Sequence, residues 1–460
     1  MAILRAYTVP HPPIIIPAVG KGSEQQIITT TTAYEQVALE IASLQPDTII
    51  LTSPHAVMYA DYFHISPGKG ATGDFAAFHL PQVQIKTFYD AELVEAIDQL
   101  AKKHTISAGI LGEKEPALDH GTMVPLYFIN QKYVNYKLVR IGLSGLPLEA
   151  HYRLGQLITH AVDQLHRRVV FIASGDLSHR LKTDGPYGFN PSGPAYDKKI
   201  MDVLRTGNFL KLLQFSDKLC QDAAECGHRS FTIMAGALDR QSVKAQQLSY
   251  EGPFGVGYGI CSFTPTGADS TRDFGAQYKV LQQSAVKIRR EQEDPYVRLA
   301  RQALETYIRT GQHVPIPAAL PAEMQHPAGA FISLKKHGRL RGCIGTIGPT
   351  KPSVAAEIIG NAISAATADP RFSPVRPDEL DELMYSVDIL GPIELIDSPD
   401  QLDIKRYGVI VTKENRRGLL LPNLESIDTI ADQIAIAKEK AGIQQSETVR
   451  LERFEVVRHF

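Results

Sequence analysis

Along residues 1–263, short apolar runs alternate with longer stretches in which apolar positions recur at helical spacing. The runs are rich in β-branched residues and predict buried strands at 2–9, 47–53, 106–110, 136–142 and 168–174. The longer stretches predict helices at 25–44, 90–103, 151–166, 197–215 and 230–238. Because strands and helices alternate, we expect an α/β domain with a central sheet flanked by helices.

Two segments of this half depart from the alternation. Residues 62–78 are rich in glycine with scattered aromatic side chains, which predicts an irregular excursion that helps to shape a pocket. Residues 250–263 predict a glycine-interrupted strand that closes the domain.

The composition turns polar from Thr264 to Ser284, which predicts a domain boundary. Beyond it, helices are predicted at 295–310, 353–366 and 427–441, and strands at 329–334, 385–390 and 408–411. This order is typical of a smaller α+β domain. We therefore expect a domain at 1–263, a linker at 264–289 and a second domain at 290–460.

Composition limits the classes of function that need to be considered. The net charge of -2 gives no electrostatic case for binding nucleic acid or an anionic membrane. No apolar run reaches a membrane-spanning length, and the first residues lack the features of a signal peptide, so we expect a cytoplasmic protein. The four cysteines form no CxxC pair, which argues against a disulfide framework or a structural zinc knuckle.

Histidines follow three of the predicted strands. His11 comes after the first strand, His55 after the second and His179 after the strand at 168–174. The carboxyl ends of parallel strands meet at one edge of a sheet, where ligands bind in open α/β folds. We therefore expect these imidazoles to lie together at a functional site.

Two neutral histidines and a carboxylate on one face of a metal form the triad of non-haem Fe(II) oxygenases. His11, His55 and Glu225 supply such a set. His120 and His179 are then predicted to act as the acid and base, because an imidazole titrates near neutral pH. Zinc or another divalent metal could use the same ligands, so a zinc-dependent hydrolase stays open as an alternative.

The first half of the chain resembles the LigB-like superfamily, which contains the class III extradiol ring-cleavage dioxygenases and the Memo family. The matching segments are Val9-Pro10-His11-Pro12-Pro13, Ser53-Pro54-His55, Asp119-His120-Gly121, Ser174-Gly175-Asp176-Leu177-Ser178-His179 and Glu225-Cys226-Gly227. The resemblance implies an iron-dependent dioxygenase that acts on a catechol or related phenolic with dioxygen, and a homodimer.

On this chain the dioxygenase resemblance assigns the iron to His11, His55 and Glu225, and the acid and base roles to His120 and His179. Asp119 and Asp176 are expected to contact and orient these side chains without binding the metal themselves. Memo proteins instead place a cysteine at the third ligand position, which here is Cys226. We expect Glu225 in first place, because a hard carboxylate suits an oxygen-activating iron, with Cys226 as the alternative.

The second half resembles the AMMECR family through Leu340-Arg341-Gly342-Cys343-Ile344-Gly345, Asp369-Pro370-Arg371-Phe372 and Ser386-Val387-Asp388-Ile389-Leu390. The first motif supplies a candidate site, Arg341 and Cys343, in which the arginine could lower the pKa of the thiol. The alternative, which the residues favour, is a small buried cysteine in a glycine turn with no chemical role. Memo-like and AMMECR-like proteins accompany a radical S-adenosylmethionine enzyme in some organisms. The resemblance therefore implies, as an alternative function, a non-oxygenase component that binds metal or substrate for such a partner.

Overall fold

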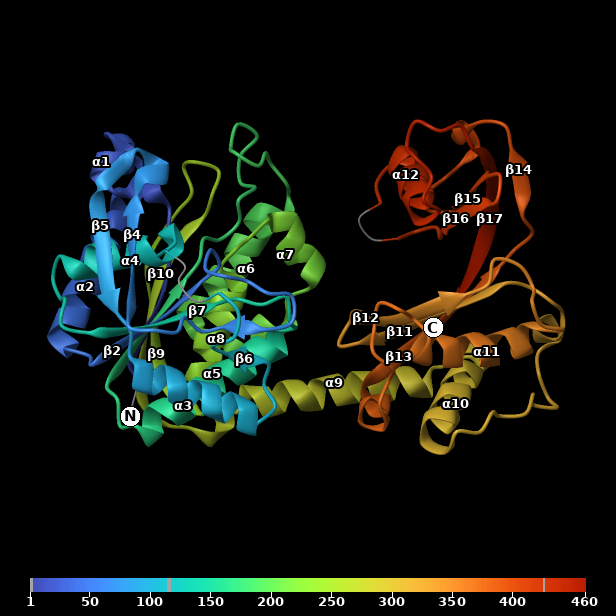
Figure 1. Ribbon diagram of the computed structural model, residues 1–460, viewed down its shortest axis with the longest axis horizontal. Helices are drawn as coiled ribbons and strands as arrows, with labels where there is room; N and C mark the ends of the chain where they lie inside the picture. The colour runs from blue at the N-terminus through green and yellow to red at the C-terminus, as the bar shows by residue number, and fades with distance from the viewer. Residues whose placement is uncertain (1–2, 114–116, 425–426) are drawn as a thin grey trace. The chain divides into compact units, whose positions relative to one another are not determined.

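The computed structural model describes residues 3–113, 117–424 and 427–460, so Ala2 of the first predicted strand lies outside the described residues. The chain divides into two compact units, Met1–Tyr278 and Lys279–Phe460. The ribbon in Figure 1 shows that each unit has its own sheet and its own helices. The division falls inside the polar segment 264–289.

The first unit is built on a six-stranded sheet in the order β7-β2-β8-β1-β10-β9. The four strands β7, β2, β8 and β1 are parallel, and β10 and β9 are antiparallel to their neighbours. Their bounds are β1 Ile3–Val9, β2 Thr48–Ser53, β7 Lys137–Gly142, β8 Val169–Ser174, β9 Gln241–Glu251 and β10 Tyr258–Ala268. The predicted α/β class is confirmed.

Helices cover both faces of this sheet (Figure 1). Because side chains alternate across a strand, Phe171 and Ala173 of β8 enter one apolar core while Val170 and Ile172 enter the other. The longer helices are α2 Ile28–Leu44, α3 Ala91–Lys103, α4 His120–Asn130, α5 Leu148–Gln164, α6 Ser192–Thr206 and α8 His228–Ala237. Shorter ones are α1 Pro17–Gly20 and α7 Asp217–Ala223.

Several expectations for this unit are wrong. The excursion at 62–78 contains strand β3 Phe63–His64, paired with β6 Ala108–Gly109, and β4 Gly70–Phe75, paired with β5 Leu80–Phe88. The predicted strand 106–110 is therefore only two residues long. The segment 250–263 is not one strand, since Tyr250 belongs to β9 and a turn separates β9 from β10.

The predicted helix at 197–215 is interrupted at Gly207, whose backbone is left-handed with φ of 65°. A glycine adopts this conformation without strain, so α6 ends there and a short 3-10 turn, Phe209–Gln214, follows. The polar segment 264–289 is also more ordered than a linker. Strand β10 continues to Ala268, and helix α9, Phe274–Glu291, follows a short turn.

The second unit has a curled antiparallel sheet in the order β12-β11-β13-β17-β15-β16, with β14 paired to β17. The strand bounds are β11 Ala330–Lys336, β12 Arg339–Gly345, β13 Leu383–Leu390, β14 Glu394–Ile396, β15 Tyr407–Lys413, β16 Arg416–Leu420 and β17 Arg450–His459. Helices α10 Pro295–Thr310 and α11 Val354–Thr367 share an apolar core with β11 and β13, and α12 Ile430–Lys440 packs over β15 and β16. The smaller α+β domain is confirmed.

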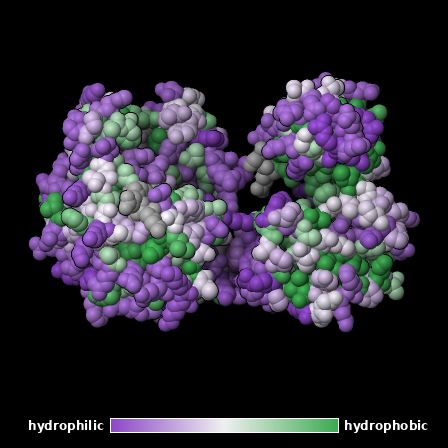
Figure 2. Space-filling view, in the orientation of Figure 1, coloured by the Kyte–Doolittle hydropathy of each residue, from purple (hydrophilic) through white to green (hydrophobic). Residues whose placement is uncertain are grey.

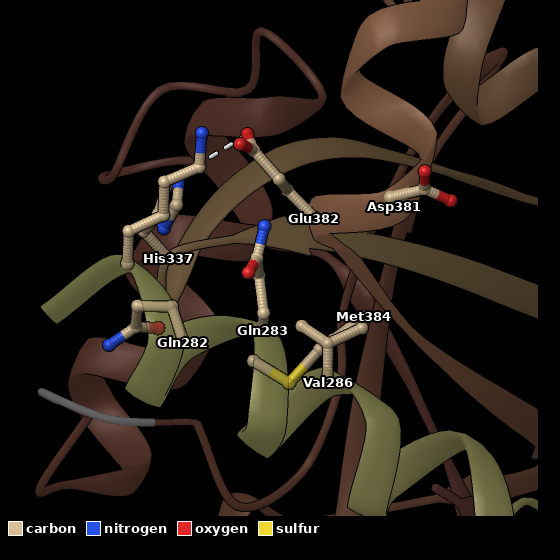
Figure 3. A pocket seen from close by; sticks show the side chains of 8 residues that line it. Gln282, Gln283, Val286, His337, Asp381, Glu382 and Met384 are labelled. Carbon is tan, nitrogen blue, oxygen red and sulfur yellow. Dashed lines mark ion pairs between the residues drawn. The ribbon is translucent and has the colours of Figure 1, made fainter. Parts of the chain in front are cut away.

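On the face of the molecule seen in Figure 2, most surface residues are hydrophilic and hydrophobic residues gather in small groups. Within the described residues, no helix combines the length and apolar character needed to cross a bilayer. Figure 3 shows a pocket of the second unit in which Val286 of α9 and Met384 of β13 face the same space. An ion pair between His337 and Glu382, at 3.4 Å, lies at its rim.

Candidate metal centre

Three side chains that could bind a metal converge at the carboxyl edge of the parallel strands. His11 follows β1, His55 follows β2, and Cys226 lies just before α8. The Nε2 atoms of His11 and His55 are 3.0 Å apart, and the Cys226 sulfur is 3.7 Å from His11 Nε2. All three donor atoms lie within 4.8 Å of one another, which is close enough to share one ion.

The sheet explains why residues so far apart in sequence meet. Strand β8 lies between β2 and β1, and the three strands are parallel, so their carboxyl ends share one edge. His179, which follows β8, has its backbone N–H bonded to the carbonyl of Ala223 at 3.0 Å. The three strands that precede the histidines are thus adjacent and parallel, as the prediction of a shared edge requires.

His11 is held by hydrogen bonds that fix the proton on its ring. Its backbone N–H donates to Asp176 Oδ1 at 2.7 Å, and its Nδ1 lies 2.9 Å from Ser174 Oγ. The Ser174 hydroxyl donates its own hydrogen to the carbonyl of Gly121 at 2.6 Å. Ser174 Oγ must therefore accept from His11 Nδ1–H, which leaves an unprotonated Nε2 facing His55.

Burial favours the neutral form of His11 and of His120. Burial, followed by the charge of His55, lowers the pKa of His11 to about 3. The same two causes lower the pKa of His120 to about 3. A neutral imidazole offers the lone pair that a metal needs, so these rings are prepared for ligation at neutral pH.

The donor set fits a transition metal. Two Nε2 atoms at 3.0 Å repel unless a proton or a cation lies between them, and a thiol stands beside them. Imidazole and thiolate are typical ligands of zinc, iron and copper. Burial, together with the charges of Asp176 and Glu225, raises the pKa of the Cys226 thiol. A bound cation would lower this pKa and favour the thiolate.

Glu225 does not join this group. Its carboxylate instead accepts a hydrogen bond of 2.6 Å from the backbone N–H of His228 at the start of α8. Burial raises the pKa of this carboxyl to about 7. The geometry therefore reverses the expected order of the third ligand and favours Cys226 over Glu225.

A close contact between two backbones accounts for this reversal. A Cβ on Gly175 would lie only 2.1 Å from the Cα of Gly227, so the segment after β8 touches the segment before α8. The Gly227 N–H donates to the Asp176 carbonyl at 3.0 Å, and the Asp176 N–H donates to the Cys226 sulfur at 3.2 Å. These bonds hold the sulfur toward His11, and the adjacent Glu225 side chain points elsewhere.

The structure brings His120 beside His11 and His55. Its ring centroid lies 4.0 Å from that of His55 and 5.4 Å from that of His11. His179 interacts electrostatically with His11 and Asp176, and its ring packs on Tyr187 at 5.2 Å. Both residues predicted to move protons therefore flank the ligand cluster; their roles stay predictions.

Asp119 and Asp176 both contact the residues that carry the site. Asp176 binds the backbone of His11, and burial raises its pKa to about 6. Asp119 caps α4 through Thr122 N–H at 3.0 Å and accepts a bond from Ser53. Burial alone would raise the pKa of Asp119, but the charge of Arg140 and these hydrogen bonds have the larger combined effect and lower it.

The sequence reasoning missed the roles of Ser174 and Arg140. Arg140 is almost fully buried and pairs with Asp119 at 2.8 Å, behind His120. A signal existed for it, because a charged residue within the apolar strand 136–142 is unusual unless it is paired. Ser174 carried no signal, since only the fold shows which ring its hydroxyl meets.

The second candidate pair of residues does not act as expected. Arg341 forms a two-point ion pair with Glu379, at 2.9 and 3.0 Å, and also donates to the carbonyl of Ser373. Its charge is therefore neutralised by Glu379 rather than directed at the thiol. Cys343 itself is half-buried and lies on β12.

Fold and site together define an α/β domain with a candidate metal centre at the carboxyl edge of its sheet, followed by an α+β domain. The chain belongs to the LigB family: the family model described as the catalytic LigB subunit of aromatic ring-opening dioxygenase matches residues 5–261. The AMMECR1 family model matches residues 297–459. Both resemblances found in the sequence are confirmed.

Relatives share one or both parts. Protein CA_C1420 of Clostridium acetobutylicum is 42% identical over 468 residues, which cover 100% of this chain and 99% of that protein. A protein of Thermotoga maritima is 51% identical over 170 residues, 36% of this chain and 98% of its own. Protein PH0010 of Pyrococcus horikoshii, a solved structure, is 34% identical with a TM-score of 0.34, and the match covers 35% of this chain and 88% of that one.

Proposed function

We propose that the first domain binds one Fe(II) ion through His11, His55 and Cys226 and oxidises a catechol or related phenolic with dioxygen. The observation that carries the proposal is the convergence of the three donor atoms within 4.8 Å at the carboxyl edge of the sheet. Membership of the LigB family supports the choice of an aromatic substrate. When bound, the ion would supply the redox chemistry that the side chains lack.

The protein's own residues would position the substrate and move its proton. The His120 ring lies 4.0 Å from the His55 ring, centroid to centroid, and His179 interacts electrostatically with His11 and Asp176. A phenol that enters between them meets two imidazoles, one of which can take the hydroxyl proton while the other returns a proton to the product. Phe78 and Tyr187 pack against these two rings and offer aromatic contacts to such a substrate.

Anaerobic reconstitution with Fe(II), followed by measurement of oxygen uptake with a panel of catechols, tests this proposal. We expect catechol-dependent oxygen uptake that His120→Ala lowers by about a hundredfold or more while iron binding is kept. Iron binding without oxygen uptake for any catechol would contradict ring oxidation and leave metal binding intact. Loss of both would contradict the whole assignment.

A second candidate function is favoured by one observation, the thiol in the place of a carboxylate. A thiolate is a softer ligand and suits a different redox role or a different metal. The domain would then be a non-oxygenase component that holds a metal or substrate for a radical S-adenosylmethionine partner. Co-purification of such an enzyme with the full chain, together with no oxygen uptake in the catechol assay, would support this function over the dioxygenase function.

A further inference from the structure

The turn that follows β8 carries His179 and is held by side chains outside the metal centre. Ser178 precedes this histidine, and its backbone N–H donates a hydrogen bond of 2.8 Å to Oδ1 of Asp197 on α6. Ser178 Oγ donates to the carbonyl of Ala223 at 2.9 Å and accepts from the N–H of Arg180 at 3.0 Å. The His179 N–H donates to the same Ala223 carbonyl at 3.0 Å. Hydrogen bonds therefore fix the backbone on both sides of His179.

Asp197 is buried, with 1% of its surface exposed, and both of its carboxylate oxygens are engaged. Oδ2 accepts a hydrogen bond of 2.8 Å from the Tyr250 hydroxyl on β9. A Cβ on Gly257 would lie only 2.1 Å from this oxygen, so the carboxylate packs directly against the backbone that enters β10. The Gly257 N–H donates to the Ser178 carbonyl at 2.8 Å. Asp197 therefore has a fixed position between α6 and the turn.

The His179 ring depends on this backbone for its orientation. Its Nδ1 atom is buried and has no hydrogen-bond partner in the described part of the chain. The ring packs edge-on against Tyr187, with 5.2 Å between the centroids. An aromatic contact of this kind contributes only about 1 kcal/mol. The hydrogen bonds of the turn therefore supply most of the restraint on the imidazole.

Other bonds hold the donors of the candidate metal centre. Oδ1 of Asp176 accepts from the His11 N–H at 2.7 Å, and the Asp176 N–H donates to the Cys226 sulfur at 3.2 Å. Among the described residues, Asp197 forms no hydrogen bond or ion pair with any of these three. Loss of the Asp197 carboxylate should therefore release the His179 end of the turn and leave the donors in place.

We propose that Asp197 is a positioning residue for His179, and that it acts through the Ser178 backbone to hold the imidazole within proton-transfer distance of the substrate. This inference rests on the proposed function, which gives His179 its acid–base role. A proton moves efficiently only across a hydrogen bond, and a displacement of about 1 Å can lower a rate by about a hundredfold. Asp197 itself touches neither the substrate nor the metal donors.

Substitutions of Asp197 in the full-length protein test this role. Asp197→Ala removes both oxygens, whereas Asp197→Asn keeps an acceptor for the Ser178 N–H. With the catechol that the wild type oxidises fastest, we expect Asp197→Ala to lower the kcat of oxygen uptake by about tenfold or more and to change KM by less than about twofold. Asp197→Asn should restore kcat to within about twofold of the wild type. Tyr250→Phe is the matched control, because it removes the second hydrogen bond of Asp197 and leaves the bond to Ser178, and it should keep kcat.

A second readout does not depend on activity. Nuclear magnetic resonance of the zinc-loaded protein with isotope-labelled histidine reports the environment of each imidazole, and the His179 signal is assigned with His179→Gln. We expect this signal to shift or broaden in Asp197→Ala and to stay in place in Asp197→Asn and Tyr250→Phe. The signals of His11 and His55 should stay in place in all three variants.

An unchanged kcat or an unchanged His179 signal in a folded Asp197→Ala protein would overturn the positioning role, because a merely structural role lowers the melting temperature and leaves both readouts as they were. If the alanine variant does not fold, Asp197→Leu replaces it, since its two methyl groups take the places of the carboxylate oxygens without accepting a hydrogen bond. If the wild type oxidises no catechol, the proposed function fails, while the His179 signal still decides whether Asp197 positions the ring.

Discussion

The smallest feature that prepares the metal centre is the hydroxyl of Ser174. It accepts from His11 Nδ1–H and donates to the Gly121 carbonyl, and so directs the lone pair of His11 Nε2 toward the other ligands. Removing a group that orients a ligand typically costs ten- to a hundredfold in metal affinity.

We therefore expect Ser174→Ala to weaken Fe(II) or Zn(II) binding by about ten- to a hundredfold, measured by competition with a chelator. Ser249→Ala is the control, because it removes a buried hydroxyl on β9 that makes no contact with a ligand. Equal affinities of the two variants would show that the tautomer of His11 is not fixed by Ser174.

A buried acid outside the metal centre gives a prediction about pH. Asp197 accepts hydrogen bonds from Ser178 N–H and the Tyr250 hydroxyl, both at 2.8 Å, and burial raises its pKa to about 7. The folded protein then holds a proton that the unfolded chain, with a pKa near 3.8, releases. The contribution of this carboxyl to stability is therefore present at low pH and lost as pH rises toward 7.

Asp197→Asn should remove this loss, because the amide is neutral at every pH in the range. Between about pH 5 and pH 8 we expect the wild-type domain to lose roughly 2 kcal/mol more free energy of unfolding than the variant. Urea unfolding of the first unit at the two pH values provides the measurement. Parallel losses in both proteins would mean that Asp197 ionises normally.

At the residue scale, the sequence predicted the two histidines of the candidate metal centre but placed Glu225 ahead of Cys226 as the third donor. His11 and His55 could be predicted because each follows a buried apolar run, and parallel strands must bring such residues together. The choice between Glu225 and Cys226 depends on the contact between Gly175 and Gly227, which only the folded chain shows. Neighbouring residues point in different directions, and composition does not reveal which one faces inward.

At the scale of elements, helices α5 and α8 of the first unit pack with their backbones in close contact. A Cβ on Gly155 of α5 would lie 2.0 Å from the carbonyl oxygen of Ile233 and 2.5 Å from the nitrogen of Ala237. A Cβ on Gly236 of α8 would likewise lie 2.0 Å from the carbonyl oxygen of Tyr152. Glycines therefore allow these two helix backbones to touch.

Gly155→Ala should lower the free energy of unfolding of the first unit by about 2 to 3 kcal/mol, because the added methyl must push the helices apart. A helical glycine with free space provides the contrast. A Cβ on Gly360 in α11 would meet nothing within 4 Å, so Gly360→Ala should stabilise the second unit by about 0.5 to 1 kcal/mol. Thermal unfolding measures both, and similar effects of the two substitutions would contradict the packing described for α5 and α8.

Buried elements could be predicted from the sequence, while exposed strands could not. Strands β2 and β8 are buried along their whole length and appear as continuous apolar runs. Strands β4 and β9 have mostly exposed or half-exposed side chains, so neither contains an apolar run. Hydrophobic patterning reports burial rather than backbone pairing, and edge strands are therefore missed.

At the scale of the whole molecule, all three donors of the candidate metal centre lie within one unit. His11, His55 and Cys226 all lie in the unit Met1–Tyr278, and the described residues of its two apolar cores belong to that unit. We expect a fragment of residues 1–278 to fold alone and to bind metal within about twofold of the affinity of the full chain. A fragment that is folded by circular dichroism but does not bind metal would show that the second unit contributes to the site.

We infer that Cys226, and not Glu225, completes a metal centre with His11 and His55. Titration with Co(II) under anaerobic conditions tests it directly, because a cobalt–thiolate bond gives a charge-transfer absorption that a carboxylate does not. We predict one Co(II) per chain with this absorption, which Glu225→Gln keeps and Cys226→Ser abolishes. Absence of the absorption in the wild-type protein, or its persistence in Cys226→Ser, would contradict the claim.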